Sequence, residues 1–503
     1  MAIELPIALP DTLLSRLSDF LELQIGLHFP RERWRDLERG IAAAARESGY
    51  KEVQAYIHWL LAAPLTRTQI EGLASHLTVG ETYFFREKRS LDILEQQILP
   101  ELLRARAPAE KHLRIWSAGC CSGEEPYSIA MLLDRLIPDL EKWNVTILAT
   151  DINPQFLRKA AQGVYGEWSF RDTPGWLKER YFIKRQDGRF EIQPRIRRMV
   201  TFSYLNLAED AYPSLVNSTN AMDLILCRNV LMYFAQERAR KVVDKLHRSL
   251  VDRGWLITSP AETSTVLFSA FTAVAFPDAF LYRRMVNAGP QTAAVTHPVP
   301  WYQGDWEATA PRAPAPAEPS EPAAFSVALS TFAPEVPYEA VAEQATESED
   351  ANSPEHDEHD ERETPQCKAR ACADEGRLAE ASAWCEKAIA ADKLNPAHYY
   401  LLATIEQERG QNEAAERALG RALYLEPDFA LAHFSLGNLC LSGGRQREAR
   451  RHFGNALTLL RACPTDALLP ESDGLSAGRL AEIIAAVQAS LPHAHKVHKE
   501  LAT

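Results

Sequence analysis

The sequence has 503 residues and a formal net charge of −13, and 46% of its residues are hydrophobic, which predicts two to four domains with packed cores. It contains neither an apolar run of the roughly 18 residues that span a bilayer nor a disulfide or zinc spacing among its eight cysteines, so we expect a cytoplasmic protein without metal ligands or direct membrane insertion. The first 288 residues hold 37 basic and 35 acidic side chains and are therefore nearly neutral. This argues against a nucleic-acid partner, because binding to the phosphate backbone requires a basic surface.

The first region, residues 1–76, has the apolar spacing of short helices. The residues that recur at this spacing are Leu13, Leu14, Leu17, Phe20, Leu21, Leu37, Ile41, Ala44 and Ala45. We therefore expect a small helical domain at the start of the chain.

Residues 77–288 alternate strand-like and helical runs. The strand candidates are Leu113–Ser117, Val145–Thr150, Met199–Ser203, Leu224–Cys227 and Leu256–Thr258, and the helical patterns include Glu124–Leu136 and Gln236–Leu250. Such alternation is typical of an α/β domain with a doubly wound, mostly parallel sheet.

The composition changes in residues 289–362, where Pro, Ala, Ser and Glu replace the periodic apolar residues. We expect a disordered, acidic linker there. A 34-residue period follows over residues 363–470, in the columns Gly376, Gly410, Gly444 and Ala381, Ala415, Ala449. This period resembles the tetratricopeptide repeat, an all-α helix pair that binds protein partners. We expect an unknown protein partner for these repeats and a capping helix within residues 471–503.

Leu113–Ala130 is typical of a strand, a glycine turn and the start of a helix. Gly119 and Gly123 allow the backbone to approach a ligand closely, but their spacing matches neither a dinucleotide site nor a phosphate loop. Glu124 and Glu125 would repel a pyrophosphate at the helix start and would suit a cation such as S-adenosylmethionine. The alternative is that both carboxylates only complement the helix dipole.

Polar residues also end the neighbouring strands. Asp151 follows the second strand, where an acidic residue typically holds ribose hydroxyl groups; the alternative is that it caps the next helix. The segment Cys227–Asn229 ends a later strand, at the edge where open α/β sheets bind ligands. Thr82 and Arg86, upstream of the first strand, could reach the same edge or lie on the surface.

Together these segments resemble the chemotaxis receptor methyltransferase (CheR) family over roughly residues 12–286. The matching stretches are Glu81–Arg86 (ETYFFR), Ser117–Ser128 (SAGCCSGEEPYS), Asp151–Ile152 and Cys227–Phe234 (CRNVLMYF). The resemblance implies a helical domain followed by a Rossmann-like domain, with a small β subdomain at about residues 181–200. It also implies methyl transfer from S-adenosylmethionine to glutamate side chains of methyl-accepting chemoreceptors, which would recruit the protein to membrane receptor arrays. The added repeats resemble the Wsp-type and Frz-type branches.

The resemblance also implies a set of site residues. The cofactor-contacting positions of the family fall on Thr82, Arg86, Glu125, Asp151, Asn206, Leu207, Cys227 and Arg228, and Gly80 and Gly119 complete the expected cofactor site. Glu125 would hold the methionine amino group and Asp151 the ribose. Arg86 and Tyr233 are the expected catalytic residues. Gly80 departs from the Asn that is usual in the family, and Ser259–Glu262 (SPAE) departs from the usual Gly-His-Ser-Glu.

The expected chemistry needs no general base, because a glutamate acceptor is already ionised at neutral pH. A nucleic-acid methyltransferase is an alternative that the sequence disfavours, since it has neither an Asp/Asn-Pro-Pro-Tyr element nor a Pro-Cys nucleophile. The second alternative is a catalytically weak scaffold that acts through its repeats.

Overall fold

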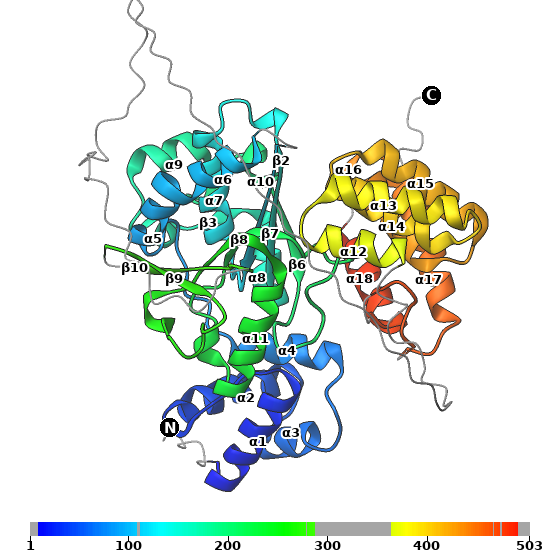
Figure 1. Ribbon diagram of the computed structural model, residues 1–503. Helices are drawn as coiled ribbons and strands as arrows, with labels where there is room; N and C mark the ends of the chain where they lie inside the picture. The colour runs from blue at the N-terminus through cyan, green and yellow to red at the C-terminus, as the bar shows by residue number, and fades with distance from the viewer. Residues whose placement is uncertain are drawn as a thin grey trace, which may run out of the picture. The chain divides into compact units, whose positions relative to one another are not determined.

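The computed structural model describes residues 9–107, 111–277, 279–286, 364–465, 467–472 and 475–490 (Figure 1). The linker expected over residues 289–362 lies outside these ranges, and so does the end of the expected capping segment, residues 491–503. Within the described ranges, every helix is too short or too polar to cross a membrane.

The chain begins with a helical domain whose apolar residues face inward. One buried cluster contains Leu17, Leu21, Leu37 and Ile41, all fully buried. The apolar residues that recur in the sequence thus form the inner faces of the first two long helices. The segments are α1 (Asp11–Gln24), η1 (Arg31–Arg33), α2 (Trp34–Glu47), α3 (Val53–Leu60) and α4 (Arg67–Leu77).

A seven-stranded sheet follows, in the order β6-β2-β1-β7-β8-β10-β9. The first five strands in that order pair in parallel, and β9 and β10 form an antiparallel hairpin at one edge. The strands are β1 (His112–Ala118), β2 (Asn144–Asp151), β6 (Val200–Tyr204), β7 (Met222–Leu226), β8 (Leu250–Ile257), β9 (Thr272–Phe276) and β10 (Ala279–Arg283). The expected α/β class is confirmed, and each expected strand ends within one residue of an observed one.

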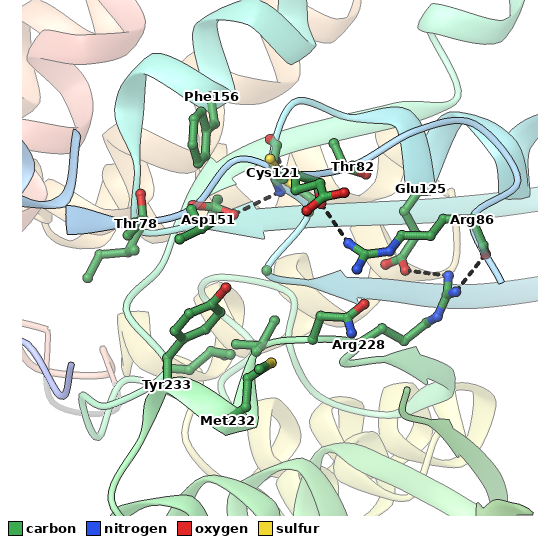
Figure 2. Close-up of a pocket in the computed structure, with 18 of the residues that line it drawn as sticks. Thr78, Thr82, Arg86, Cys121, Glu125, Asp151, Phe156, Arg228, Met232 and Tyr233 are labelled. Atoms are coloured by element: carbon green, nitrogen blue, oxygen red, sulfur yellow. Dashed lines mark hydrogen bonds and ion pairs between the residues drawn. The ribbon is translucent and has the colours of Figure 1, made fainter. Parts of the chain in front are cut away.

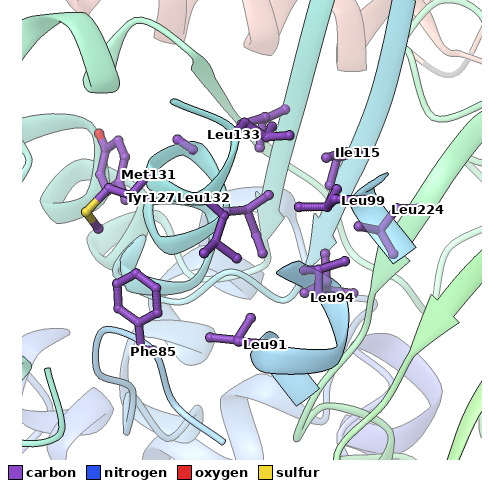
Figure 3. Close-up of a cluster of buried hydrophobic side chains, with 14 of the residues drawn as sticks. Phe85, Leu91, Leu94, Leu99, Ile115, Tyr127, Met131, Leu132, Leu133 and Leu224 are labelled. Atoms are coloured by element: carbon purple, nitrogen blue, oxygen red, sulfur yellow. The ribbon is translucent and has the colours of Figure 1, made fainter. Parts of the chain in front are cut away.

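Helices cover both faces of this sheet, and the central strand shows why. Ile115 of β1 packs into a cluster with the helices before and after it, whereas its neighbour Trp116 packs into a second cluster on the opposite face. Figure 3 shows the first cluster, in which Leu132 and Leu133 lie beside Leu99 and Ile115. The main helices are α5 (Lys88–Ile93), η2 (Leu94–Ile98), α6 (Leu99–Arg106), α7 (Glu124–Leu136), α8 (Pro154–Gln162) and α11 (Gln236–Ser249).

A second, three-stranded sheet has the order β3-β5-β4. Its first strand, β3 (Val164–Tyr165), lies before the expected range of 181–200. The sequence did not reveal this strand, because two residues are too few to give an alternation that a sequence pattern can detect. The neighbouring elements are η4 (Glu167–Phe170), α9 (Gly175–Tyr181), β4 (Phe182–Lys184), β5 (Phe190–Ile192) and α10 (Pro194–Arg197).

Among the residues that the structure describes, the C-terminal part has three helix pairs and a further helix. Gly376, Gly410 and Gly444 lie between the helices of successive pairs with φ angles of 74°, 75° and 75°, a left-handed conformation that glycine adopts without strain. The repeated alanines are buried where paired helices cross. The helices are α12 (Pro365–Asp374), α13 (Leu378–Ala391), α14 (Pro396–Glu408), α15 (Asn412–Leu425), α16 (Ala430–Ser442), α17 (Gln446–Arg461) and α18 (Ala477–Ser490).

Candidate active site

A cavity of about 330 Å³ opens at the carboxyl ends of the parallel strands (Figure 2). Its wall combines the ends of β1, β2, β6 and β7 with several residues between Thr78 and Arg86 and with Ile25 and Leu27 of the helical domain. The charged groups are distributed along it: Arg86, Glu125 and Arg228 gather at one end, and Asp151 lies beside Phe156 and Thr78 at the other.

The glycine turn after β1 forms the floor of this cavity. Gly119 has a φ of 87°, and a Cβ atom there would lie 2.4 Å from a methyl carbon of Val230. Gly123 has a φ of 92°, and a Cβ atom there would lie 2.9 Å from the Cβ of Ala160. Both glycines are therefore required by backbone conformation and by close approach.

The two adjacent carboxylates at the start of α7 point to different places. Glu125 lines the cavity, whereas Glu124 is 1% exposed and accepts hydrogen bonds from Ser122 Oγ at 2.7 Å and Ser169 Oγ at 3.0 Å. Successive helical residues do not share a face. Of the two carboxylates at the helix start, only Glu125 therefore lines the cavity, whereas Glu124 ties the glycine turn to η4.

Glu125 is held by two partners at the charged end of the cavity. Its Oε1 accepts from Ser117 Oγ at 2.7 Å and its Oε2 from Arg228 Nη1 at 3.0 Å. Arg228 also pairs with Glu87 at 2.9 Å and donates to the carbonyl of Arg86 at 2.6 Å. Burial by itself would lower the pKa of Arg228, but the carboxylates of Glu125 and Glu87 raise it.

Asp151 ends β2 and is nearly buried. Its two oxygens accept from the backbone N–H groups of Cys121 and Asn153, both at 2.8 Å. Burial raises the pKa of Asp151 to about 6, although these hydrogen bonds act in the opposite direction. The cap of α8 is Asn153, which accepts from Gln155 N and Phe156 N, so the alternative that Asp151 is merely a helix cap is wrong.

The backbone of the loop after β7 is held by Glu262, which does not itself line the cavity. Asn229 has a left-handed φ of 58°, and its N–H donates to Glu262 Oε2 at 2.7 Å. Glu262 also accepts from Met232 N at 3.2 Å and from Ser259 Oγ at 2.9 Å. The Ser-x-x-Glu spacing of Ser259 and Glu262 is a capping-box signal; it indicates the pairing of these two residues but not the hydrogen bonds from Asn229 and Met232.

The cavity brings together most of the expected site residues. Among the described residues, its lining includes Thr82, Arg86, Gly119, Glu125, Asp151, Asn206, Leu207, Arg228 and Tyr233 but neither Gly80 nor Cys227. A Cβ atom at Gly80 would lie 2.5 Å from the Phe156 ring, so Phe156 fills the place of a side chain there. Cys227 is fully buried at the strand end. Phe156 and Met232, which the sequence analysis did not single out, also line the cavity.

The side chains present fit S-adenosylmethionine. One end offers a carboxylate, Glu125, for an ammonium group and a guanidinium, Arg86, for a carboxylate. The other end offers Asp151 for ribose hydroxyl groups, which is the usual role of an acidic residue at this strand end. The described residues contain no cluster of three or more potential metal ligands.

Known proteins resemble the chain over this region and beyond. Residues 80–275 match the family model described as CheR methyltransferase, SAM binding domain. A chemotaxis protein methyltransferase of Borreliella burgdorferi is 33% identical over 252 residues, which cover 50% of this chain and 87% of that protein. The probable biofilm formation methyltransferase WspC of Pseudomonas aeruginosa is 30% identical over 391 residues, which cover 76% of this chain and 84% of that protein. Among solved structures, the second TPR of Spaghetti (RPAP3) aligns at 21% identity with a TM-score of 0.19, covering 20% of this chain and 95% of that one.

Proposed function

Since this chain belongs to the CheR family of chemotaxis methyltransferases, we propose that it transfers the methyl group of S-adenosylmethionine to glutamate side chains of a methyl-accepting receptor. The observation that carries the proposal is the charge distribution of the cavity, with Arg86, Glu125 and Arg228 at one end and Asp151 at the other. This distribution suits a ligand with an amino acid group at one end and a ribose at the other.

Each end of the cavity then has a distinct role. Glu125 holds the methionine ammonium group, and Arg228 orients that carboxylate. Arg86 holds a carboxylate, either that of the methionine or that of the acceptor, and its guanidinium is oriented by donation to the carbonyl of Glu81 at 2.6 Å. Asp151 holds the ribose hydroxyl groups, and Phe156 and Leu207 provide apolar surface nearby for the adenine.

The protein contributes orientation and desolvation rather than proton transfer. When bound, S-adenosylmethionine would supply a methyl group on a sulfonium: an acceptor carboxylate oxygen would bond to the methyl carbon in line with the breaking C–S bond, and the neutral thioether, S-adenosylhomocysteine, would leave. The acceptor glutamate, with a free pKa of about 4.3, needs no base. Burial raises the pKa of Tyr233, so its hydroxyl group stays protonated and donates to one acceptor oxygen while the other attacks. Alignment and exclusion of water supply the rate enhancement.

Tritiated-methyl transfer to a purified receptor cytoplasmic fragment tests this proposal. Alkaline treatment should release the counts as volatile methanol, because carboxyl methyl esters are base-labile and N-methyl groups are not. Arg185→Gln, in an exposed ion pair with Glu191, is the control variant and should transfer at the wild-type rate. Base-stable counts would contradict the proposal.

The helix pairs of the C-terminal part suit a second task, the binding of a protein partner that brings the enzyme to its receptor array. The alternative of a catalytically weak scaffold predicts no cofactor affinity. A calorimetric titration with S-adenosylmethionine separates the two: micromolar binding supports the enzyme, and an absence of binding heat at millimolar ligand supports the scaffold.

A further inference from the structure

Beside the cavity, cationic and aromatic side chains form a continuous row. The Cζ atom of Arg171 lies 3.8 Å from the ring centroid of Tyr83 and 4.7 Å from that of Trp168. Arg86 extends the row, with its Cζ 5.9 Å from the Tyr83 centroid. Tyr83 and Arg86 line the cavity, whereas Trp168 is 74% exposed. We call Tyr83, Arg171 and Trp168 the rim ledge, because they lead from the cavity to the surface.

The turn that carries Trp168 is firmly held. Ser169 Oγ donates to the buried carboxylate of Glu124 at 3.0 Å, and Ser169 O accepts from Phe84 N at 2.9 Å. The next residue, Phe170, is buried and stacks on Phe84 with ring centroids 5.0 Å apart. The indole of Trp168 is therefore exposed on a fixed support, and its exposure is not a consequence of loose packing.

The simplest role for Arg171 is an ion pair with Glu81, but this pair alone does not explain the position of the guanidinium. Arg171 Nη2 lies 3.5 Å from Glu81 Oε1, and the Glu81 side chain is 69% exposed. Because Glu81 is solvated, this pair contributes little to stability; Arg171, whose side chain is 19% exposed, is held mainly by the two rings and by donation from its Nη1 to the Trp168 carbonyl at 3.0 Å. The pair does show that a carboxylate can reach Arg171 from the solvent side, and an incoming carboxylate could replace that of Glu81.

The residue types of the rim ledge are those that dominate binding at protein interfaces. Trp, Tyr and Arg are enriched among the residues that contribute most to affinity, and the Arg171 guanidinium, ordered by ring stacking and by donation from Nη1 to the Trp168 carbonyl, presents Nη2 to a carboxylate. The surrounding segment, residues 164–200, carries nine basic and five acidic side chains. Both features favour an acidic partner.

We propose that the rim ledge binds the acceptor segment of the receptor, with Arg171 holding a second carboxylate beside the glutamate that enters the cavity and Trp168 covering the apolar surface between them. This inference rests on the proposed function and adds an acceptor-specificity site to it.

With the reacting glutamate held at Arg86, one of the two roles given to that arginine above, the geometry limits the spacing of the two carboxylates. The distances of 5.9 and 3.8 Å from the Tyr83 centroid mean that the Cζ atoms of Arg86 and Arg171 are at most about 10 Å apart. On a helix, residues three or four apart are neighbours at about 5–6 Å, and residues seven apart are separated by about 10 Å along the axis. The second carboxylate should therefore lie one or two helical turns from the reacting glutamate.

Binding of two helical peptides to the full-length protein saturated with S-adenosylhomocysteine tests the inference. One peptide carries glutamates four residues apart, and the other has glutamine at the second position. We expect the wild type to bind the first peptide about tenfold more tightly, Arg171→Gln to bind both equally, and Trp168→Ala to bind both about tenfold more weakly. The controls are Arg185→Gln, an exposed arginine of the same β subdomain, and Trp59→Ala, a partly exposed tryptophan of α3.

Two further measurements distinguish a failure of the rim-ledge inference from a folding defect in the variants and from a failure of the proposed function. The affinity for S-adenosylhomocysteine and the melting temperature should stay at wild-type values in Arg171→Gln and Trp168→Ala; a loss of cofactor affinity in either would overturn the inference. So would equal or undetectable binding of the two peptides by the wild type, or equal losses in the control variants. Base-labile methyl transfer to the receptor fragment is scored separately, so it can persist when the ledge inference fails, and the peptide preference can persist when the transfer assay fails.

Discussion

Arg228 Nη1 lies 3.0 Å from Glu125 Oε2, so the end of β7 is joined to the first turn of α7 across the charged end of the cavity. The Arg228 side chain is 4% exposed and the Glu125 side chain 14%. One cation thus connects two segments that are about 100 residues apart in the sequence, and it does so at the place where the cofactor's amino acid group is expected to bind.

Replacing Arg228 with glutamine should destabilise the protein and abolish cofactor binding. The change leaves Glu125 and Glu87 without their shared cation, and breaking a buried pair on one side costs about 3–5 kcal/mol. We expect the melting temperature to fall by roughly 10 °C, measured by circular dichroism. Arg185→Gln, which breaks only exposed pairs, should leave the melting temperature within about 1 °C, in line with the small contribution of such pairs. An Arg228→Gln variant with the melting temperature of the wild type would show that the ion pair between Arg228 and Glu125 does not stabilise the folded protein.

Replacing Arg86 with alanine should reduce kcat/KM for methyl transfer by about 10- to 100-fold, the equivalent of one charge-assisted hydrogen bond. Arg86→Lys should recover part of this loss, because it keeps the charge but not the fork of donors. Initial rates of tritiated-methyl transfer at varied cofactor and receptor concentrations measure the effect. A rate within a few-fold of wild type in Arg86→Ala would reject a role for Arg86 in positioning either substrate.

Much of the site could be predicted from the sequence because it is built on local patterns. The strand ends at Ala118, Asp151 and Leu226 follow from short apolar runs, and parallel strands present their carboxyl ends at one edge. The motif residues that follow them therefore meet in one cavity. The direction of Glu124 was also predictable, since it is one position from Glu125 on a helix.

Other features depend on contacts between distant residues, which one sequence does not reveal. Phe156 occupies the space beside Gly80, and this complementarity joins α8 to a loop some 75 residues earlier. In the rim ledge, likewise, the guanidinium of Arg171 stacks on the ring of Tyr83, although the two residues are far apart in the sequence. No periodicity signals either contact, because each depends on tertiary packing.

Glu262 should act as a positioning residue. Its carboxylate holds the N–H groups of Asn229 and Met232, and a glutamine would put an amide NH2 against one of them, so we expect Glu262→Gln to raise the KM for S-adenosylmethionine about tenfold with a smaller effect on kcat. Asn229→Gly, which suits the left-handed φ of 58°, should retain the wild-type melting temperature. A lower kcat with an unchanged KM in Glu262→Gln would contradict this role.

Asp151 should make cofactor affinity and stability respond to pH in opposite directions. Burial raises the pKa of its carboxyl group from 3.8 to about 6, so the folded protein binds this proton more tightly than the unfolded chain does. Its contribution to the free energy of unfolding is therefore fully present below pH 3.8 and is lost as the pH rises through 6. Going from pH 7.5 to 5.5 should restore about 1 kcal/mol of stability to the ligand-free protein from this group.

The same change in pH should weaken ligand binding, because the ribose hydroxyl groups donate to the ionised carboxylate. About a quarter of the molecules would be ionised at pH 5.5, so we expect the Kd of S-adenosylhomocysteine to rise about fourfold between pH 7.5 and 5.5. Isothermal titration calorimetry at both pH values measures this, with denaturant unfolding as the parallel measurement. Asp151→Asn should bind more weakly and without a pH dependence over this range. A fourfold change that persists in Asp151→Asn would assign the titration to another group.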